Sequence, residues 1–148
     1  MSIVIRPGGL DDLQVLLTDV PELQIPFDRD AAQDRLAQQG LVLVAAIDDQ
    51  DVGFKAGYDR YGDGSFYSWL GGVFPAARRH GVAQALMDAQ HRTAQQRGYT
   101  GIYVKTRNRY VGMRILLARN GYQVCGFDPG GAEGKDLGEA RLLHYFRL

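Results

Sequence analysis

The segment from Phe66 to Lys105 constrains the fold more than any other part of the chain. An apolar stretch over 66–74 is followed by a basic turn with a glycine, an amphipathic stretch that ends at Gly98, and a second apolar stretch over 99–105. The spacing of the apolar residues predicts a strand, a helix and a strand in that order. Two strands joined through one helix run parallel in one sheet, so the segment predicts a parallel crossover.

The flanking sequence predicts antiparallel strands and further helices, punctuated by Gly, Pro and Asp turns. Strands are expected at 3–6, 41–47, 52–60, 122–127 and 141–146, and helices at about 11–17, 28–39 and 109–120. A Gly-rich loop is expected over 128–140. The order β-α-α-β-β-β-α-β-α-β-β predicts an α/β (α+β) fold with a mixed, mainly antiparallel sheet of about seven strands and helices on both faces. No linker or repeat divides the chain, so a single domain over residues 1–148 is expected.

The charge of the chain argues against a nucleic-acid partner and against an anionic membrane. Lys plus Arg equals Asp plus Glu at 17 each, and the longest apolar run, 41–47, is too short to span a bilayer. The N-terminus lacks the layout of a signal peptide, which favours a cytoplasmic protein. The basic and aromatic residues at 105–110 are typical of RNA-binding surfaces, but the neutral net charge favours contact with a phosphate-bearing ligand instead.

The cysteine and histidine content excludes several kinds of site. Cys125 is the only cysteine, so an internal disulfide and a multi-cysteine metal site are excluded, and its apolar surroundings predict a buried, inert thiol. His80 and His91 are eleven residues apart, about 16 Å along a helix, which is too far to share a metal ion. No metal is expected.

The turn before the central helix is predicted to bind an anion. Arg78, Arg79 and His80 precede Gly81, and no Ser, Thr, Asp or Asn stands where a helix cap would be. The first backbone N–H groups and the positive end of the helix dipole would then be open to a phosphate or a pyrophosphate. The competing interpretation is a solvated surface turn.

This turn resembles the acyl-CoA-binding signature of the GNAT superfamily of N-acetyltransferases. Arg78, Gly81 and Ala83 fill its three fixed positions, and the steps at Val73–Pro75, Asn108 and Gly121–Tyr122 fall where the family has comparable elements. The resemblance covers nearly the whole chain. It implies acetyl-CoA as co-substrate, an amine as acceptor and no metal.

The resemblance also implies which residues hold the cofactor. The backbone from Arg79 to Ala83 would cradle the pyrophosphate, with His80, Gly81 and Val82 inside that run and Arg78 or Arg79 adding charge. The edge formed by Gly71, Gly72 and Val73 would pair with pantetheine, and Asn108 would bond to the pantetheine arm. Taken from the residues alone, Gly71–Gly72 predicts a bulge or a close backbone approach, and Asn108 could equally cap the helix at 109–120.

The acid and the base of the reaction stay open. The family commonly has a tyrosine four residues before the glycine that corresponds to Gly121, and this chain has Leu117 there. Tyr110 lies two turns earlier on about the same face of the predicted helix. Tyr110 is therefore a candidate acid, and water relayed through Tyr67 or Ser68 a candidate base. Glu22 and Asp59 are further candidates for the base, and an aromatic lining of the acceptor side is expected from Tyr58, Tyr61, Tyr67 and Trp69.

The sequence thus predicts an N-acetyltransferase that moves an acetyl group from acetyl-CoA to a primary amine by direct attack in a ternary complex. The acceptor is expected to be a small-molecule or peptide amine, and a homodimer is left open. The alternative is a non-catalytic acyl-CoA sensor or interaction module of the same fold.

Overall fold

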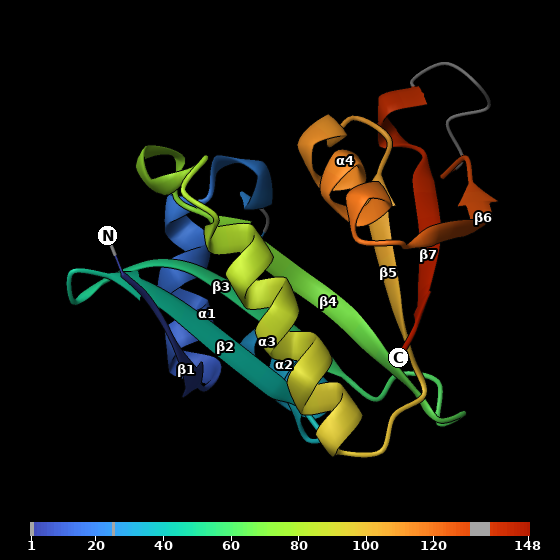
Figure 1. The fold of residues 1–148 in the computed structure, drawn as a ribbon, viewed down its shortest axis with the longest axis horizontal. Helices are drawn as coiled ribbons and strands as arrows, with labels where there is room; N and C mark the ends of the chain where they lie inside the picture. The colour runs from blue at the N-terminus through green and yellow to red at the C-terminus, as the bar shows by residue number, and fades with distance from the viewer. Residues whose placement is uncertain (1, 25, 131–136) are drawn as a thin grey trace.

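The computed structural model describes residues 2–24, 26–130 and 137–148. It contains seven strands and four α-helices within these residues, with short 3-10 turns between them (Figure 1). In chain order they are β1 (Ile3–Gly8), α1 (Leu10–Leu16), η1 (Leu17–Asp19), η2 (Pro21–Leu23), α2 (Arg29–Leu36), β2 (Leu41–Ile47), β3 (Gln50–Tyr58), β4 (Ser65–Val73), η3 (Pro75–Ala77), α3 (Val82–Gln96), β5 (Gly101–Arg107), α4 (Val111–Arg119), β6 (Gln123–Asp128), η4 (Leu137–Glu139) and β7 (Arg141–Arg147). The predicted element order is confirmed.

The strands form one sheet in the order β1-β2-β3-β4-β5-β7-β6. Every neighbouring pair is antiparallel except β4 and β5, which are parallel and joined through α3. The predicted parallel crossover and the mixed, mainly antiparallel sheet are therefore confirmed. Because β7 lies between β5 and β6, the strand that comes last in the chain is not at the edge of the sheet.

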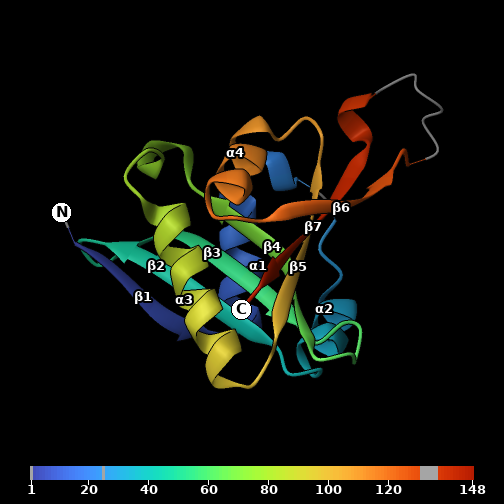
Figure 2. The ribbon, with the colours of Figure 1, turned by 45° about the vertical axis from the view of Figure 1, so that its right-hand side comes forward.

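Helices cover both faces of the sheet, as expected (Figures 1 and 2). On one face, α3 and α4 pack over a core that includes Phe66, Leu86 and Leu117. On the other face, α1 and the η1 turn pack over a second core that includes Leu13, Val20 and Phe54. Neighbouring residues of β3 and β4 point into opposite cores, as the pleat of a strand requires.

The parallel pair is short, and this positions the site. β4 and β5 pair only from Ser65–Gly101 to Ser68–Val104, although both strands continue further. The residues 70–73 of β4 therefore pair with β3 on one side and with no described strand on the other. We call this segment the free edge of β4. Figure 1 shows the two strands diverging along it, toward the start of α3 and toward α4.

The structure corrects three details of the sequence prediction. β1 continues through Pro7 to Gly8, because an edge strand tolerates a proline that donates no ladder hydrogen bond. Cys125 is exposed rather than buried, because β6 is an edge strand and the register with β7 shifts at this residue. The β3–β4 register shift falls at Trp69, between Ser68 and Leu70, rather than at Gly71–Gly72. Of the predicted loop at 128–140, residues 131–136 lie outside the described part.

Candidate active site

The start of α3 is open, as the sequence predicts. Gly81 precedes the helix with φ 82° and ψ 11°, and no side chain caps it. Ala85 is the first residue of the helix whose N–H bonds back into the turn, to the Gly81 carbonyl at 3.0 Å. The amides of Val82, Ala83 and Gln84 are thus available to a ligand, and the helix dipole favours a negative one.

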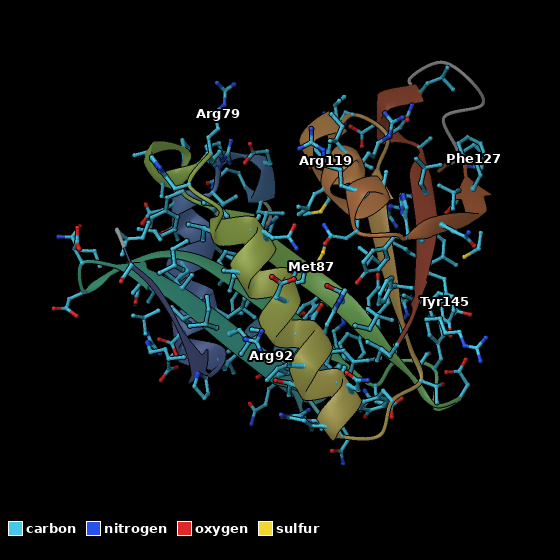
Figure 3. All side chains as sticks on the ribbon, viewed as in Figure 1. Arg79, Met87, Arg92, Arg119, Phe127 and Tyr145 are labelled. Carbon is cyan, nitrogen blue, oxygen red and sulfur yellow. The ribbon has the colours of Figure 1, made fainter. Side chains whose placement is uncertain are left out.

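The two arginines of this turn have different surroundings. Arg78 donates from Nε to the Val73 carbonyl at 3.0 Å and from Nη2 to Glu22 Oε2 at 2.7 Å. Arg79 has no ion pair or hydrogen bond with a described side chain, and it extends away from the molecule (Figure 3). Its φ of 67° is unusual for a residue with a Cβ, and that conformation costs about 1 to 2 kcal/mol. Arg79, rather than Arg78, is the arginine free to contact a phosphate.

Glu22 connects two segments on either side of the free edge of β4. Its carboxylate accepts from Arg78, in the turn before α3, and its backbone carbonyl accepts from the Tyr110 hydroxyl, before α4, at 3.2 Å. The Arg78 guanidinium holds the Glu22 pKa below its ordinary value. A carboxylate that is paired and ionised in this way is a weak base, so the contact favours a tether rather than proton abstraction.

We predict a small, pH-dependent cost for Glu22→Gln. Both side chains of the pair are more than a third exposed, at 41% and 37%, so the loss at pH 7 should be at most about 1 kcal/mol. A lowered pKa stabilises the fold above the ordinary carboxyl value of 4.5, and this contribution is lost as the pH falls through the folded value. Urea unfolding at pH 7 and pH 3 checks this. An equal cost at both pH values would show that the contact is not ionic.

The segment expected to pair with pantetheine has an unpaired backbone edge. Gly72 and Val73 belong to the free edge of β4, and Gly72 approaches the other core closely. A Cβ placed on Gly72 would lie 2.8 Å from Val20 Cγ2, so the sequence expectation of a close approach is met by Val20. Val73 is held from the other side, because its carbonyl accepts from Arg78.

Asn108 lies between β5 and α4 but does not cap the helix. The residue that precedes α4 is Tyr110, without a side-chain cap, so the expectation of a helix cap at Asn108 is wrong. The loop is fixed by backbone contacts instead: Asn108 donates to the Ala140 carbonyl at 2.8 Å and accepts from Arg114 at 2.9 Å. No described residue bonds to the side-chain amide of Asn108, which leaves that group available to a ligand.

The aromatic rings expected to line the acceptor side lie together on the face of the sheet opposite α3. Tyr67 makes edge contacts with Tyr58 and Tyr61, at ring distances of 5.7 Å and 5.9 Å, and Tyr58 makes one with Trp69 at 5.8 Å. Burial raises the pKa of Tyr67, so its hydroxyl stays protonated at neutral pH. Tyr67 can therefore pass a proton through water but does not itself serve as an ionised base.

The position that the family commonly fills with tyrosine contributes no proton. Leu117 is completely buried in the core beneath α4. Tyr110, the substitute named from the sequence, lies before α4 and donates to Glu22. α4 contains no tyrosine, histidine, cysteine or carboxylic acid, so the helix itself offers no ordinary proton donor.

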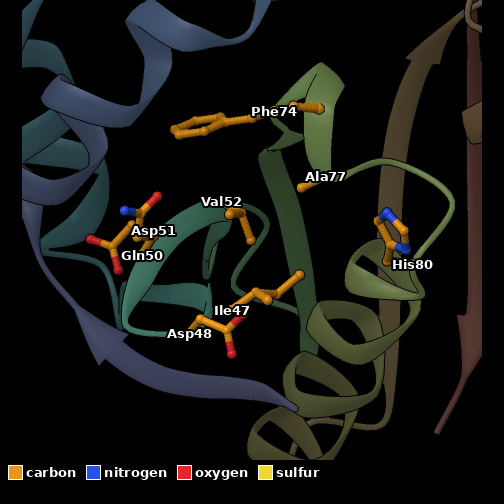
Figure 4. A pocket seen from close by; sticks show the side chains of 9 residues that line it. Ile47, Asp48, Gln50, Asp51, Val52, Phe74, Ala77 and His80 are labelled. Atoms are coloured by element: carbon orange, nitrogen blue, oxygen red, sulfur yellow. The ribbon is translucent and has the colours of Figure 1, made fainter. Parts of the chain in front are cut away.

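A surface hollow of about 640 Å³ lies between the turn before α3 and the turn that joins β2 and β3 (Figure 4). His80 and Phe74 line it together with Asp48 and Asp51 from the β2–β3 turn. Asp51 is paired with Arg6, but Asp48 has no such partner among the described residues, and a carboxylate is an unfavourable neighbour for a phosphate. The helix start is therefore the better candidate for an anion site.

Two features together define the class of this protein. The described seven-stranded sheet opens where its parallel strands β4 and β5 diverge, and the uncapped start of α3 lies beside that opening. A family model described as acetyltransferase (GNAT) domain matches residues 38–129, more than half of the chain. The chain belongs to the GNAT family of acetyltransferases, and the resemblance seen at Arg78, Gly81 and Ala83 is confirmed.

Solved structures share this fold at low sequence identity. The IAA acetyltransferase from Bacillus cereus superposes with a TM-score of 0.81 at 17% identity, covering 99% of this chain and 100% of that one. The ribosomal-protein-S18-alanine N-acetyltransferase from Escherichia coli has a TM-score of 0.82 at 12% identity, covering 99% and 94%. A Bacillus subtilis acetyltransferase in complex with CoA has a TM-score of 0.78 at 17% identity, covering 99% of each chain. No curated protein sequence matches the chain.

Two features are absent from the described residues. None of the helices in that part of the chain is both long and apolar enough to cross a bilayer. The same residues contain no group of three or more His, Cys, Asp or Glu side chains that could hold a metal ion.

Proposed function

We propose that this protein transfers an acetyl group from acetyl-CoA to a primary amine by direct attack in a ternary complex. The observation that carries the proposal is the uncapped start of α3, which lies directly beyond the free edge of β4. One ligand would bind both sets of unpaired backbone groups of the protein. Its pyrophosphate would bind the N–H groups at the helix start, and its extended, amide-bearing arm would pair with the free edge of β4. Solved relatives with CoA or acetyl-CoA bound support this assignment.

The residues named from the sequence for cofactor binding each have a role in this proposal. The amides from Arg79 to Ala83, including those of His80, Gly81 and Val82, bind the pyrophosphate. Gly72 and Val73 align the pantetheine arm, and Asn108 bonds to it. Arg78 holds the turn through Val73 and Glu22, while Arg79 reaches the phosphates.

The acceptor is proposed to approach the thioester from the face that carries Tyr67 and Trp69. Aromatic rings with polar tips can hold a small amine or the end of a peptide. Two of the solved relatives are named as ribosomal-protein alanine N-acetyltransferases, which makes a peptide N-terminus one natural candidate. We propose a single acetyltransferase domain over 1–148, acting in the cytoplasm.

Two measurements test the proposal. Calorimetry with coenzyme A tests the cofactor, and thiol release from acetyl-CoA with a panel of amines tests turnover. The panel contains a polyamine, free amino acids, an aminated antibiotic, an alanine-terminated peptide and a lysine peptide. Because Cys125 is exposed and would react with a disulfide reagent, Cys125→Ser protein is used for the thiol assay. If coenzyme A binds but no amine of the panel causes thiol release from acetyl-CoA, the alternative of a non-catalytic acyl-CoA sensor is favoured.

A further inference from the structure

One cationic side chain is buried beneath α3 without an acidic partner. Lys55 lies in the middle of β3, and only 6% of its surface is exposed. No described residue forms an ion pair or a side-chain hydrogen bond with its ammonium group. An unpaired buried charge costs several kcal/mol, which sets Lys55 apart from the other residues of β3.

The ammonium of Lys55 lies against the free edge of β4. Lys55 pairs with Gly71 across the sheet. A Cβ placed on Gly71 would lie 3.7 Å from Lys55 Cγ and 3.8 Å from Lys55 Nζ. The lysine side chain therefore lies across β4 at a position where β4 has no side chain of its own.

A second polar group is buried over the same part of the sheet. Gln90 of α3 is completely buried, and neither atom of its amide has a hydrogen-bond partner among the described residues. A Cβ placed on Gly53 would lie 3.5 Å from Leu86 Cδ1, so this part of α3 packs over the start of β3. β3 and α3 both run opposite to β4 and so run in the same direction as each other. The helix rises about 6 Å from Leu86 to Gln90, and the strand advances a similar distance, about 7 Å, from Gly53 to Lys55. This spacing aligns Gln90 with Lys55 along α3 and β3.

The remaining groups that face Lys55 leave it able to give up a proton. Leu43 and Gly71 pair with it from β2 and β4, and neither carries charge. On α3, burial lowers the pKa of His91, and the charge of Lys55 lowers it further. His91 Nε2 lies 2.6 Å from the Tyr122 hydroxyl, so these two groups are paired with each other. Burial lowers the pKa of Lys55 to about 8, and the amine is therefore largely protonated at neutral pH.

We propose that Lys55 protonates the thiolate that leaves when the acetyl group is transferred. The inference rests on the proposed function. The acceptor nitrogen forms a bond to the acetyl carbon, the carbon–sulfur bond breaks, and its electron pair stays on sulfur. Sulfur takes a proton from Lys55 Nζ, the proton lost by the acceptor nitrogen passes to water, and Lys55 regains a proton from water. Oxidation states are unchanged.

The first test needs no acceptor and uses coenzyme A alone. The ultraviolet absorbance of the thiolate is followed against pH for coenzyme A bound to each protein. A cation within reach of sulfur should make the bound thiol titrate about one to three pH units below the free thiol. Lys55→Met should abolish this shift. Arg147→Met, which removes one positive charge from an exposed position of β7, should keep it.

The second test follows turnover with any amine accepted in the panel. Lys55→Met should lower kcat about 100-fold, the range for a lost general acid, with the KM for acetyl-CoA within about twofold. The wild-type rate should fall as the pH rises past about 8, because the donor loses its proton, and Lys55→Met should lack this fall. Its melting temperature should not decrease, because the substitution removes an unpaired buried charge.

The outcomes separate the two proposals. If coenzyme A does not bind to wild-type protein, the proposed function and the role of Lys55 fail together. If it binds and the thiol titrates alike in wild type and Lys55→Met, only the assignment of Lys55 is overturned. An acetyl group found on Lys55 by mass spectrometry after incubation with acetyl-CoA would also overturn it, because the amine would then be a nucleophile.

Discussion

Gly81→Glu is expected to weaken coenzyme A binding at least about 100-fold. The substitution places a carboxylate beside the free amides of Val82 and Ala83, where the pyrophosphate is proposed to lie. Two like charges about 4 Å apart repel by about 4 kcal/mol near a protein surface, and each 1.4 kcal/mol is a factor of about ten in affinity. Calorimetry with coenzyme A measures the loss.

Gly98→Glu is the matched control at the other end of the same helix. Gly81 and Gly98 have φ of 82° and 89°, and a Cβ on either would meet nothing within 4 Å. The backbone strain of the two variants is therefore similar, and the added charge is the same. A carboxylate is favourable at a helix start and unfavourable at its end, so Gly98→Glu should be the less stable variant. Equal losses of affinity would remove the cofactor site from the start of α3.

The second large effect concerns stability. Gly72→Ala should destabilise the fold by about 2 kcal/mol, within the usual range for overpacking a core. The new Cβ would lie 2.8 Å and 2.9 Å from the two methyl carbons of Val20, which is only 2% exposed. Either the strand or the η1–η2 segment must move, and Glu22, in η2, would move with it. Urea unfolding at pH 7 measures the change.

Gly71→Ala is the neighbouring control, and Val20→Ala is the rescue. A Cβ on Gly71 would meet its nearest described atoms at 3.6 Å to 3.8 Å, which is ordinary contact, so this variant should lie within about 0.5 kcal/mol of wild type. Combined with Val20→Ala, the Gly72→Ala cost should fall by about 1 kcal/mol or more, a favourable coupling in the double-mutant cycle. Additive costs would show that Val20 is not the obstacle.

The features that could be predicted from the sequence are local ones. The strand–helix–strand order from Phe66 to Lys105 follows from periodicity within one segment, and the open start of α3 follows from the absence of a capping residue before Val82. The order of the elements was sufficient to predict a mixed sheet with one parallel pair. None of these inferences requires contacts between distant segments.

The features that escaped prediction depend on distant segments. Glu22 meets Arg78 and Tyr110 across 56 and 88 residues of sequence. The exposure of Cys125 depends on β7 lying between β5 and β6, since the apolar composition around the residue is equally typical of an interior strand. Asn108 does not cap α4, because the loop is fixed instead through its backbone to Ala140.

A signal for the buried lysine is present in the sequence. Lys55 interrupts the apolar stretch between Phe54 and Ala56, and alternation places it on the opposite face from both. In a strand with only one buried face, such a lysine would be exposed. Here β3 lies inside the sheet with helices on both sides, so both of its faces are buried. Only the position of β3 in the assembled sheet distinguishes the two cases.

The register shift in β4 gives the molecule a natural optical reporter. Trp69 is the only tryptophan of the chain, and it lies where β4 and β5 cease to pair. The guanidinium of Arg35 lies 5.0 Å from the centre of its ring, and Tyr58 meets it edge-on. Intrinsic fluorescence excited in the indole band therefore comes from this one location. A titration can follow its emission directly, without attaching a dye.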